Sequence, residues 1–135
     1  MGILLLFNGG LMLFSGLTSF ILKDGVTFEL TLSAFLVLSA GALMMLFGRQ
    51  HNKQIQKREG YLIVSLGWVL MSLSGTIPYL LSGAIPNFTA AFFETMSGYT
   101  TTGASILNDI EIIPKGVLFW RSTTHWIGGM GIIVL

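Results

Sequence analysis

The sequence predicts an all-α membrane protein, in which an N-terminal helical hairpin precedes a long helix, a short helix with a loop, and a return helix that is cut off. Composition is the first reason: of the 135 residues, 53% are hydrophobic and 10% are charged, and the mean hydropathy is +0.78. A soluble domain carries about 25% charged residues, so too little polar surface exists here to cover a water-soluble core. The second reason is that no charge interrupts the stretches 2–22, 30–48 and 60–93.

The charge balance and the lack of cysteine exclude several classes of function. Lys and Arg number 7 and Asp and Glu number 6, and the net charge of +1 provides no basic field for nucleic acid. With no cysteine, the chain has neither a disulfide framework nor a thiolate metal site. We therefore expect a lipid bilayer as the surroundings of the chain and no nucleic-acid partner.

Residues 1–48 are predicted to form a transmembrane hairpin, because 2–22 and 30–48 each approach the roughly 20 apolar residues that cross a bilayer. A polar loop over 49–59 follows. It holds four of the seven basic residues, namely Arg49, Lys53, Lys57 and Arg58. Basic residues in short loops stay in the cytoplasm. We expect a multi-pass protein of the cell (inner) membrane with its N-terminus and this loop in the cytoplasm, and we interpret the loop as a solvated linker rather than a ligand site.

Residues 60–135 are predicted to form one unit of helix, short helix with loop, and helix. The third span covers about 61–80, and Pro78 is expected to kink or end it. The return helix covers 116–135 and is still apolar where the sequence stops.

A short helix is predicted between these two, over about 88–99. Asn87 or Thr89 is its expected N-cap, and Gly98 its expected terminator. At 1.5 Å per residue, about 11 helical residues measure about 16 Å, which is roughly half a bilayer. Such a helix lies at the interface, or enters the membrane and turns back.

The strand after the short helix, 100–105, consists of small and hydroxylated residues. Non-helical backbone at membrane depth is tolerated only where protein buries it or where it lines a watery path. Carbonyl and threonine oxygens can replace the water around a cation without trapping it by a fixed charge. Gly103 permits the positive φ that turns neighbouring carbonyls the same way, and the negative end of the helix dipole points to the same place. The pattern predicts a pore loop, and an ordinary external loop remains the alternative.

Two charged residues are expected at membrane depth, Glu94 in the short helix and Arg121 about one turn into the return helix. An ionisable group in this position is costly, so it usually faces a partner in protein or water. We predict that Glu94 and Arg121 form a structural ion pair behind the ion filter that the predicted pore loop would form, and hold the short helix in place. Solvation of both side chains outside the membrane is the alternative.

His125 follows Arg121 by four residues and shares its helical face. A lone histidine in a membrane helix is more often a packing residue than a proton relay, and we favour packing. A membrane enzyme using His125 would need a second catalytic group in register with it, and none is evident. We therefore expect no enzyme and no catalytic residue, with that enzyme or a non-transporting helical membrane module as alternative functions.

Three stretches resemble one known family in their order and spacing. They are 97–105 (SGYTTTGAS), 120–132 (containing WRS and HWIGGMGI) and 58–79 (containing REGY and GTIPY). Together they resemble the Trk/Ktr/HKT potassium uptake proteins, most closely the Trk-type potassium uptake membrane subunit. The resemblance is strong over about 58–135, whereas the two leading spans resemble the N-terminal hairpin of the Trk branch by pattern only.

The resemblance implies potassium uptake through a single pore with four filter strands, one from each of four helix–pore-loop–helix repeats. It assigns Gly103 as the filter glycine and Thr101 and Thr102 as the carbonyl donors before it, with Ala104 on the outer side and Thr100 deeper. The backbone carbonyls of Thr101, Thr102 and Gly103 are expected to bind K⁺ as the transported ion. No covalently bound cofactor is expected.

The resemblance also implies partners. This sequence holds the first repeat only, so we expect an N-terminal fragment, with the remaining three pore repeats missing from this chain. Members of the family form homodimers in the membrane and pair with a cytosolic nucleotide-binding regulatory subunit, and both are expected here.

Overall fold

The computed structural model describes residues 1–48 and 57–134, and within these ranges all regular elements are helices. In chain order they are α1 (Gly2–Leu22), α2 (Thr27–Gly48), α3 (Lys57–Leu81), α4 (Phe88–Tyr99) and α5 (Lys115–Val134). The predicted all-α class is confirmed.

Three of the described helices are long and apolar enough to cross a membrane: Gly2–Leu22, Thr27–Gly48 and Arg58–Leu81. They coincide with the first three predicted spans. The fourth predicted span, α5, has 20 residues but is not among these three. Its sequence includes Lys115, Arg121 and His125, which make it less apolar than the other long helices.

Helix α3 decides between the two predicted effects of Pro78, in that the helix does not end there, and it differs from the prediction at its start. Pro78 lies inside α3, which continues to Leu81. The helix does not end there because the carbonyl of Pro78 accepts the N–H of Ser82 at 3.1 Å, so the helical pattern resumes after the proline. At its other end α3 begins at Lys57, inside the predicted loop 49–59, and the loop residues 49–56 lie outside the described residues.

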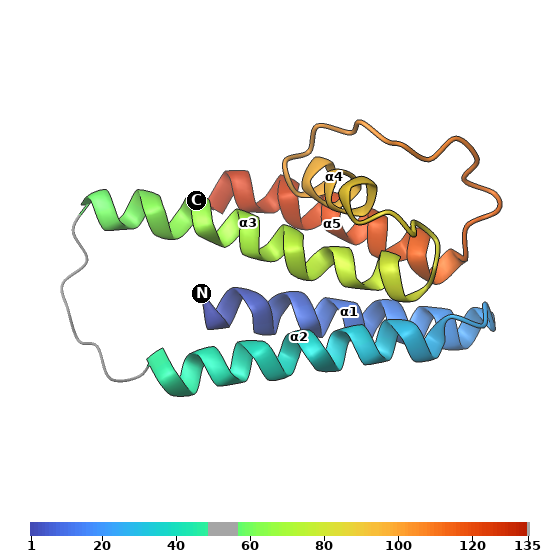
Figure 1. The fold of residues 1–135 in the computed structure, drawn as a ribbon, viewed down its shortest axis with the longest axis horizontal. Coiled ribbons are helices and arrows are strands. Elements are labelled where there is room, and N and C mark those ends of the chain that lie inside the picture. Colours follow the sequence, from blue (N-terminus) through green and yellow to red (C-terminus); the bar gives the residue numbers. More distant parts are fainter. Residues whose placement is uncertain (49–56, 135) are drawn as a thin grey trace.

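Helix α1 is at the centre of the bundle. It runs antiparallel to α2 and also contacts α3 and α5 (Figure 1). In Figure 1 the four long helices follow the long axis of the molecule, whereas α4 is seen almost end-on and therefore crosses them steeply. The segment after α4 arches over the outside of the bundle and returns to the start of α5.

The α1–α2 hairpin packs through small residues. A Cβ atom at Gly9 would lie 2.7 Å from Cγ of Leu38, and one at Gly16 would lie 2.9 Å from Cγ2 of Thr31. From the α2 side, a Cβ atom at Gly41 would lie 3.1 Å from the carbonyl oxygen of Gly2. Such close approach of backbones is the usual way in which helices associate in lipid.

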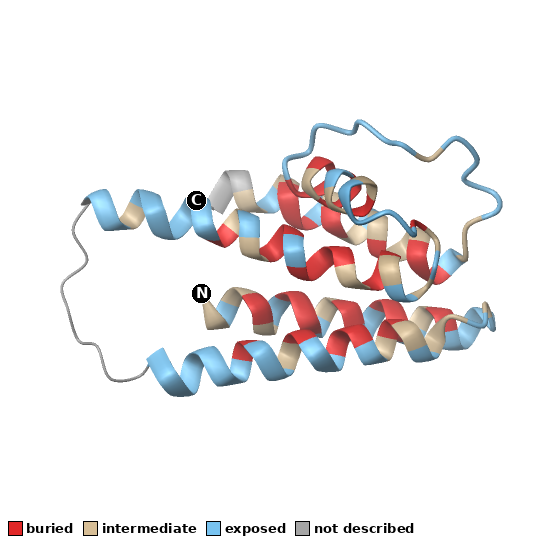
Figure 2. Cartoon of the chain, in the orientation of Figure 1, coloured by how far each residue is buried: buried red, intermediate tan, exposed pale blue. Residues whose placement is uncertain are grey.

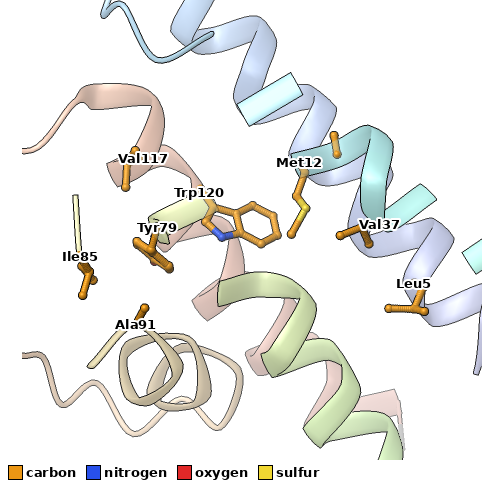
Figure 3. Packing of buried hydrophobic residues seen from close by; sticks show 9 residues of the cluster. Leu5, Met12, Val37, Tyr79, Ile85, Ala91, Val117 and Trp120 are labelled. Atoms are coloured by element: carbon orange, nitrogen blue, oxygen red, sulfur yellow. The ribbon is translucent and has the colours of Figure 1, made fainter. Parts of the chain in front are cut away.

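The apolar core joins the hairpin to the rest of the chain. The fully buried indole of Trp120 on α5 points towards Met12 of α1, with Tyr79 of α3 on its other side (Figure 3). Its Nε1–H donates to the carbonyl of Gly75 at 3.1 Å, which satisfies the polar end of the ring.

The outer faces of the bundle are largely exposed (Figure 2). Many of the exposed residues there are large and apolar. Phe28 and Phe35 on α2 are 72% and 71% exposed, and Phe7 on α1 is 53% exposed. Apolar exposure on this scale marks a surface that meets lipid or another protein. The described helices therefore bury both polar and apolar side chains and expose many large apolar ones, as the helices of a membrane protein do.

Candidate functional site

The short helix α4 has 12 residues and measures about 18 Å, about half the thickness of a bilayer. Asn87 is its N-cap, and Oδ1 of Asn87 accepts the N–H of Thr89 at 3.0 Å. The prediction that Gly98 ends the helix is wrong, because α4 continues through Tyr99 and has Thr100 as its C-cap. Gly98 serves packing instead.

The C-terminal end of α4 is held tightly against α5. A Cβ atom at Gly128 would overlap the carbonyl group of Tyr99 and lie 2.8 Å from the carbonyl oxygen of Gly98. In the other direction, a Cβ atom at Gly98 would overlap the hydroxyl of Thr124. Both glycines are therefore required by contact, and the end of the short helix has a fixed position relative to α5.

The segment that follows α4 is not helical. The N–H of Thr102 still bonds to the carbonyl of Ser97 at 3.0 Å, and beyond this turn the backbone is irregular. Gly103 has a positive φ of 75°, as predicted, and Thr101 also has a positive φ of 56°. The second value was not predicted, because a β-branched residue rarely occupies this region and does so at a cost of about 1–3 kcal/mol.

The carbonyl groups of this segment fall into two kinds. The carbonyl of Thr100 accepts the hydroxyl of Thr101 at 2.7 Å, and that of Ala104 accepts the hydroxyl of Ser97 at 2.6 Å. Between them, the carbonyls of residues 101–103 accept no hydrogen bond from any residue that the structure describes. Residues 100–105 are exposed in the single chain (Figure 2). The middle of the segment therefore offers backbone oxygens that no group of the described chain occupies.

Glu94 is the most connected side chain near this segment. Its Oε1 lies 2.6 Å from Nε of Arg121, so the structure brings the two predicted partners together. The Glu94 carboxylate also accepts the hydroxyl of Ser105 at 3.0 and 3.1 Å and the N–H of Ile106 at 3.0 Å. The side chain of Glu94 is fully buried and that of Arg121 is 21% exposed. The alternative prediction, that both side chains are solvated, is therefore wrong for Glu94.

Sequence reasoning missed the two further partners of Glu94. The sequence offered only the hydroxyl of Ser105, in a stretch of small residues. A serine in such a stretch does not indicate which group its hydroxyl bonds. With these two partners, the carboxylate joins α4, α5 and the Ser105 end of the 100–105 segment. The hydroxyl of Ser105 also accepts the N–H of Leu107 at 3.1 Å. A buried carboxylate is stable only with such a set of donors.

His125 and its neighbours bond to their own helix. Nδ1 of His125 lies 2.9 Å from the carbonyl oxygen of Arg121. The hydroxyls of Thr123 and Thr124 donate to the carbonyls of Phe119 and Arg121 at 2.8 and 2.7 Å. In the described part of the chain, no group of three or more His, Asp or Glu side chains is placed to hold a metal ion. The side chains of Thr123, Thr124 and His125 therefore contact backbone carbonyls of the preceding turn of α5.

These features define the class of the protein: an α-helical membrane protein in which a half-length helix packs against two long helices. The loop that follows it has carbonyls that no described residue occupies. The family model described as "TrkH: Cation transport protein" matches residues 26–135, and the chain belongs to this family.

Several known proteins are similar to this chain. The Trk system potassium uptake protein TrkH of Escherichia coli K12 is 39% identical over 99% of it, and the Trk system potassium uptake protein TrkG of the same organism is 33% identical over 84%. The crystal structure of the potassium transporter TrkH from Vibrio parahaemolyticus matches 99% of the chain with a TM-score of 0.91 and 38% identity. The chain spans 28% of the length of the Escherichia coli TrkH and 29% of the Vibrio chain.

Proposed function

We propose that this chain takes part in potassium uptake across the cell membrane and contributes one of four filter strands to the pore. The observation that carries the proposal is the run of unoccupied carbonyls at 101–103, directly after the C-terminal end of a half-length helix. Membership of a cation transport family, and relatives named as potassium uptake proteins, support it.

In this proposal the carbonyl oxygens of Thr101, Thr102 and Gly103 bind K⁺. Such oxygens replace the water shell of the ion, and the negative end of the α4 dipole adds to their attraction. The carbonyls of Thr100 and Ala104 each accept a side-chain hydroxyl, which fixes the inner and outer ends of the strand. No charged side chain lies within 100–105, so the ion is attracted without being trapped.

The proposed direction of transport is inward, down the electrochemical gradient. The membrane potential contributes about 2.3 kcal/mol per charge per 100 mV. The basic residues of the 49–59 loop support a cytoplasmic position for that loop and the N-terminus. The turn between α1 and α2 and the segment between α3 and α5 then face outwards, so that the pore loop opens to the outside.

One strand covers only one side of an ion, so three further strands must complete the filter. We infer that the rest of a longer polypeptide supplies them, since the chain spans 28% of the Escherichia coli TrkH. A membrane homodimer and a cytosolic nucleotide-binding regulatory subunit are the proposed partners on the basis of the family resemblance.

The test is potassium uptake by the full-length polypeptide that contains these residues, expressed in a bacterial strain that cannot grow in low potassium. The unaltered protein is expected to restore growth, and Gly103→Asp to abolish it, because a carboxylate in the filter traps the cation. Further repeats of the same kind are expected in the continuing reading frame.

Gly103→Ala and Gly83→Ala form a matched pair. Gly103 has a φ of 75° and Gly83 a φ of 70°, and neither would place a Cβ atom near another group. The backbone cost of about 1–2 kcal/mol is therefore the same at both positions. Only Gly103→Ala is expected to lower the rate of uptake. The proposal is wrong if Gly103→Asp leaves uptake unchanged, or if Gly83→Ala lowers it as much as Gly103→Ala.

A further inference from the structure

A chain of buried polar side chains crosses the bundle from α1 to α4. The amide Nδ2 of Asn8 donates to the hydroxyl of Ser74 on α3 at 2.8 Å, and the hydroxyl of Tyr99 donates to Oδ1 of Asn8 at 2.5 Å. Ser74 in turn donates to the carbonyl of Met71 at 2.9 Å. Asn8 and Tyr99 have no exposed surface, and Ser74 is 9% exposed.

The surroundings of this chain of hydrogen bonds are apolar. Tyr99 packs with Met71 and Ile127, and its ring lies 6.4 Å from that of Trp68. Apolar side chains could fill such a site without the need to satisfy any polar group, and an unpaired amide would be costly there. The polar groups therefore specify a geometry that apolar packing alone would leave loose.

The position of Tyr99 gives this geometry a consequence for the pore loop. Tyr99 is the last residue of α4, and the 100–105 strand begins with the next residue. Its carbonyl group lies against Gly128 of α5, and its hydroxyl is held by Asn8 of α1. In the described part of the chain the backbone of α1 does not lie against α4, so the Asn8 side chain spans the distance between them.

We propose that Asn8 and Tyr99 are positioning residues for ion selection: through their hydrogen bond the N-terminal hairpin fixes the inner end of the filter strand. The hairpin is then part of the selecting machinery and not only a membrane anchor. This inference rests on the proposed function. A filter that selects by the placement of carbonyl oxygens loses discrimination when the end of its strand can move, while the overall fold remains.

The experiment compares Tyr99→Phe with Tyr79→Phe in the full-length protein. Both tyrosines are fully buried, and both substitutions remove one hydroxyl. The hydroxyl of Tyr79 has no hydrogen-bond partner among the described residues, whereas that of Tyr99 binds Asn8. The readouts are the ratio of potassium to sodium uptake, the KM for potassium against the maximal rate, and the amount of protein in the membrane.

Tyr99→Phe is expected to lower the potassium-to-sodium ratio about fivefold, the factor that one net hydrogen bond corresponds to, at unchanged abundance. Tyr79→Phe is expected to leave the ratio unchanged. Asn8→Leu is expected to lower the ratio at least as much as Tyr99→Phe, because it also removes the hydrogen bond to Ser74. The double variant is expected to be no worse than Asn8→Leu alone, because both substitutions remove the Asn8–Tyr99 hydrogen bond.

Two outcomes would overturn the inference. If Tyr99→Phe and Asn8→Leu lower only the abundance or the maximal rate and leave the ratio unchanged, the hydrogen bonds serve the fold alone. If Tyr79→Phe changes the ratio as much as Tyr99→Phe, loss of any buried hydroxyl suffices. Failure of the proposed function is a separate result, since the unaltered protein would then take up no potassium, and this inference would fall with it.

Discussion

The two ends of the 100–105 segment are held by different kinds of chemistry. At the Ser105 end, the carboxylate of Glu94 binds the guanidinium of Arg121, the hydroxyl of Ser105 and a backbone N–H. At the other end, which follows Tyr99, the uncharged side chains of Asn8 and Tyr99 are joined by a hydrogen bond, with Ser74 as the third member.

The groups at the two ends are similarly buried but differ in charge. The side chain of Glu94 is fully buried and that of Arg121 is 21% exposed. Asn8 and Tyr99 have no exposed surface. A buried charge is costly unless it is paired and hydrogen-bonded, whereas neutral groups need only one partner each. The comparison teaches that a buried carboxylate needs several donors where neutral groups need one, and it leads us to expect larger effects from changes at the charged end.

The largest effect is expected for Glu94→Gln. The substitution keeps the shape of the side chain but leaves Arg121 without a counter-charge, and breaking a buried pair in this way costs about 3–5 kcal/mol. Unfolding of the purified protein in detergent, followed by tryptophan fluorescence, measures the loss. Arg121→Lys is the control, because it keeps the charge and loses only the planar geometry of the guanidinium.

A charge swap sharpens the same point. Glu94→Arg combined with Arg121→Glu restores opposite charges, yet an arginine at position 94 has no acceptor for the hydroxyl of Ser105 or the N–H of Ile106. We expect no recovery of uptake from the swap. Full recovery would show that the ion pair alone matters and that the contacts with the strand do not.

A smaller effect, of about 1–3 kcal/mol, is expected for Gly128→Ala, which forces a methyl group against the carbonyl of Tyr99. Gly129→Ala is the matched control, because the nearest atom to its Cβ would be Cγ2 of Thr101 at 3.9 Å. Detergent unfolding and potassium uptake of the two variants should diverge. Equal behaviour would mean that α4 and α5 can separate without consequence at the inner end.

The smallest effect is expected for Asp24→Ala. The Oδ2 atom of Asp24, in the α1–α2 turn, accepts the N–H of Gly116 at the start of α5 at 2.7 Å. Loss of a side-chain acceptor at a helix N-terminus costs about 1 kcal/mol. Asp109→Ala is the control, since among the described residues Asp109 accepts only the N–H of Glu111, within the exposed loop. A shift of the unfolding midpoint by Asp109→Ala as large as that by Asp24→Ala would contradict a role of this contact in joining the hairpin to α5.

Much of the fold could be predicted from the sequence. The lengths of the uncharged apolar stretches locate α1, α2 and α3. The cost of an unpaired charge in a membrane predicts that Glu94 pairs with Arg121. The positive φ of Gly103 was predictable because glycine has no Cβ atom and adopts positive φ values readily. Local reasoning was wrong at Gly98, where contact with Thr124 of α5, rather than helix termination, requires a glycine.

The remaining contacts depend on tertiary structure. Nothing near Asn8 indicates that its amide meets Tyr99, and nothing near Ser105 indicates that its hydroxyl meets Glu94, because these pairs become neighbours only when the helices assemble. The positive φ of Thr101 could not be predicted from the sequence either, because threonine rarely adopts it. The turn that ends α4, in which the N–H of Thr102 bonds to the carbonyl of Ser97, imposes this conformation.

Asn8 is synthesised long before the residues that it binds. Ser74 and Tyr99 follow it by 66 and 91 residues. At about 5–20 residues per second, the ribosome adds Tyr99 roughly 5–18 s after Asn8. Throughout that interval α1 carries an amide whose native partners are incomplete, so the Asn8 side chain reaches both of its hydrogen-bond partners only once the fourth helix has been translated.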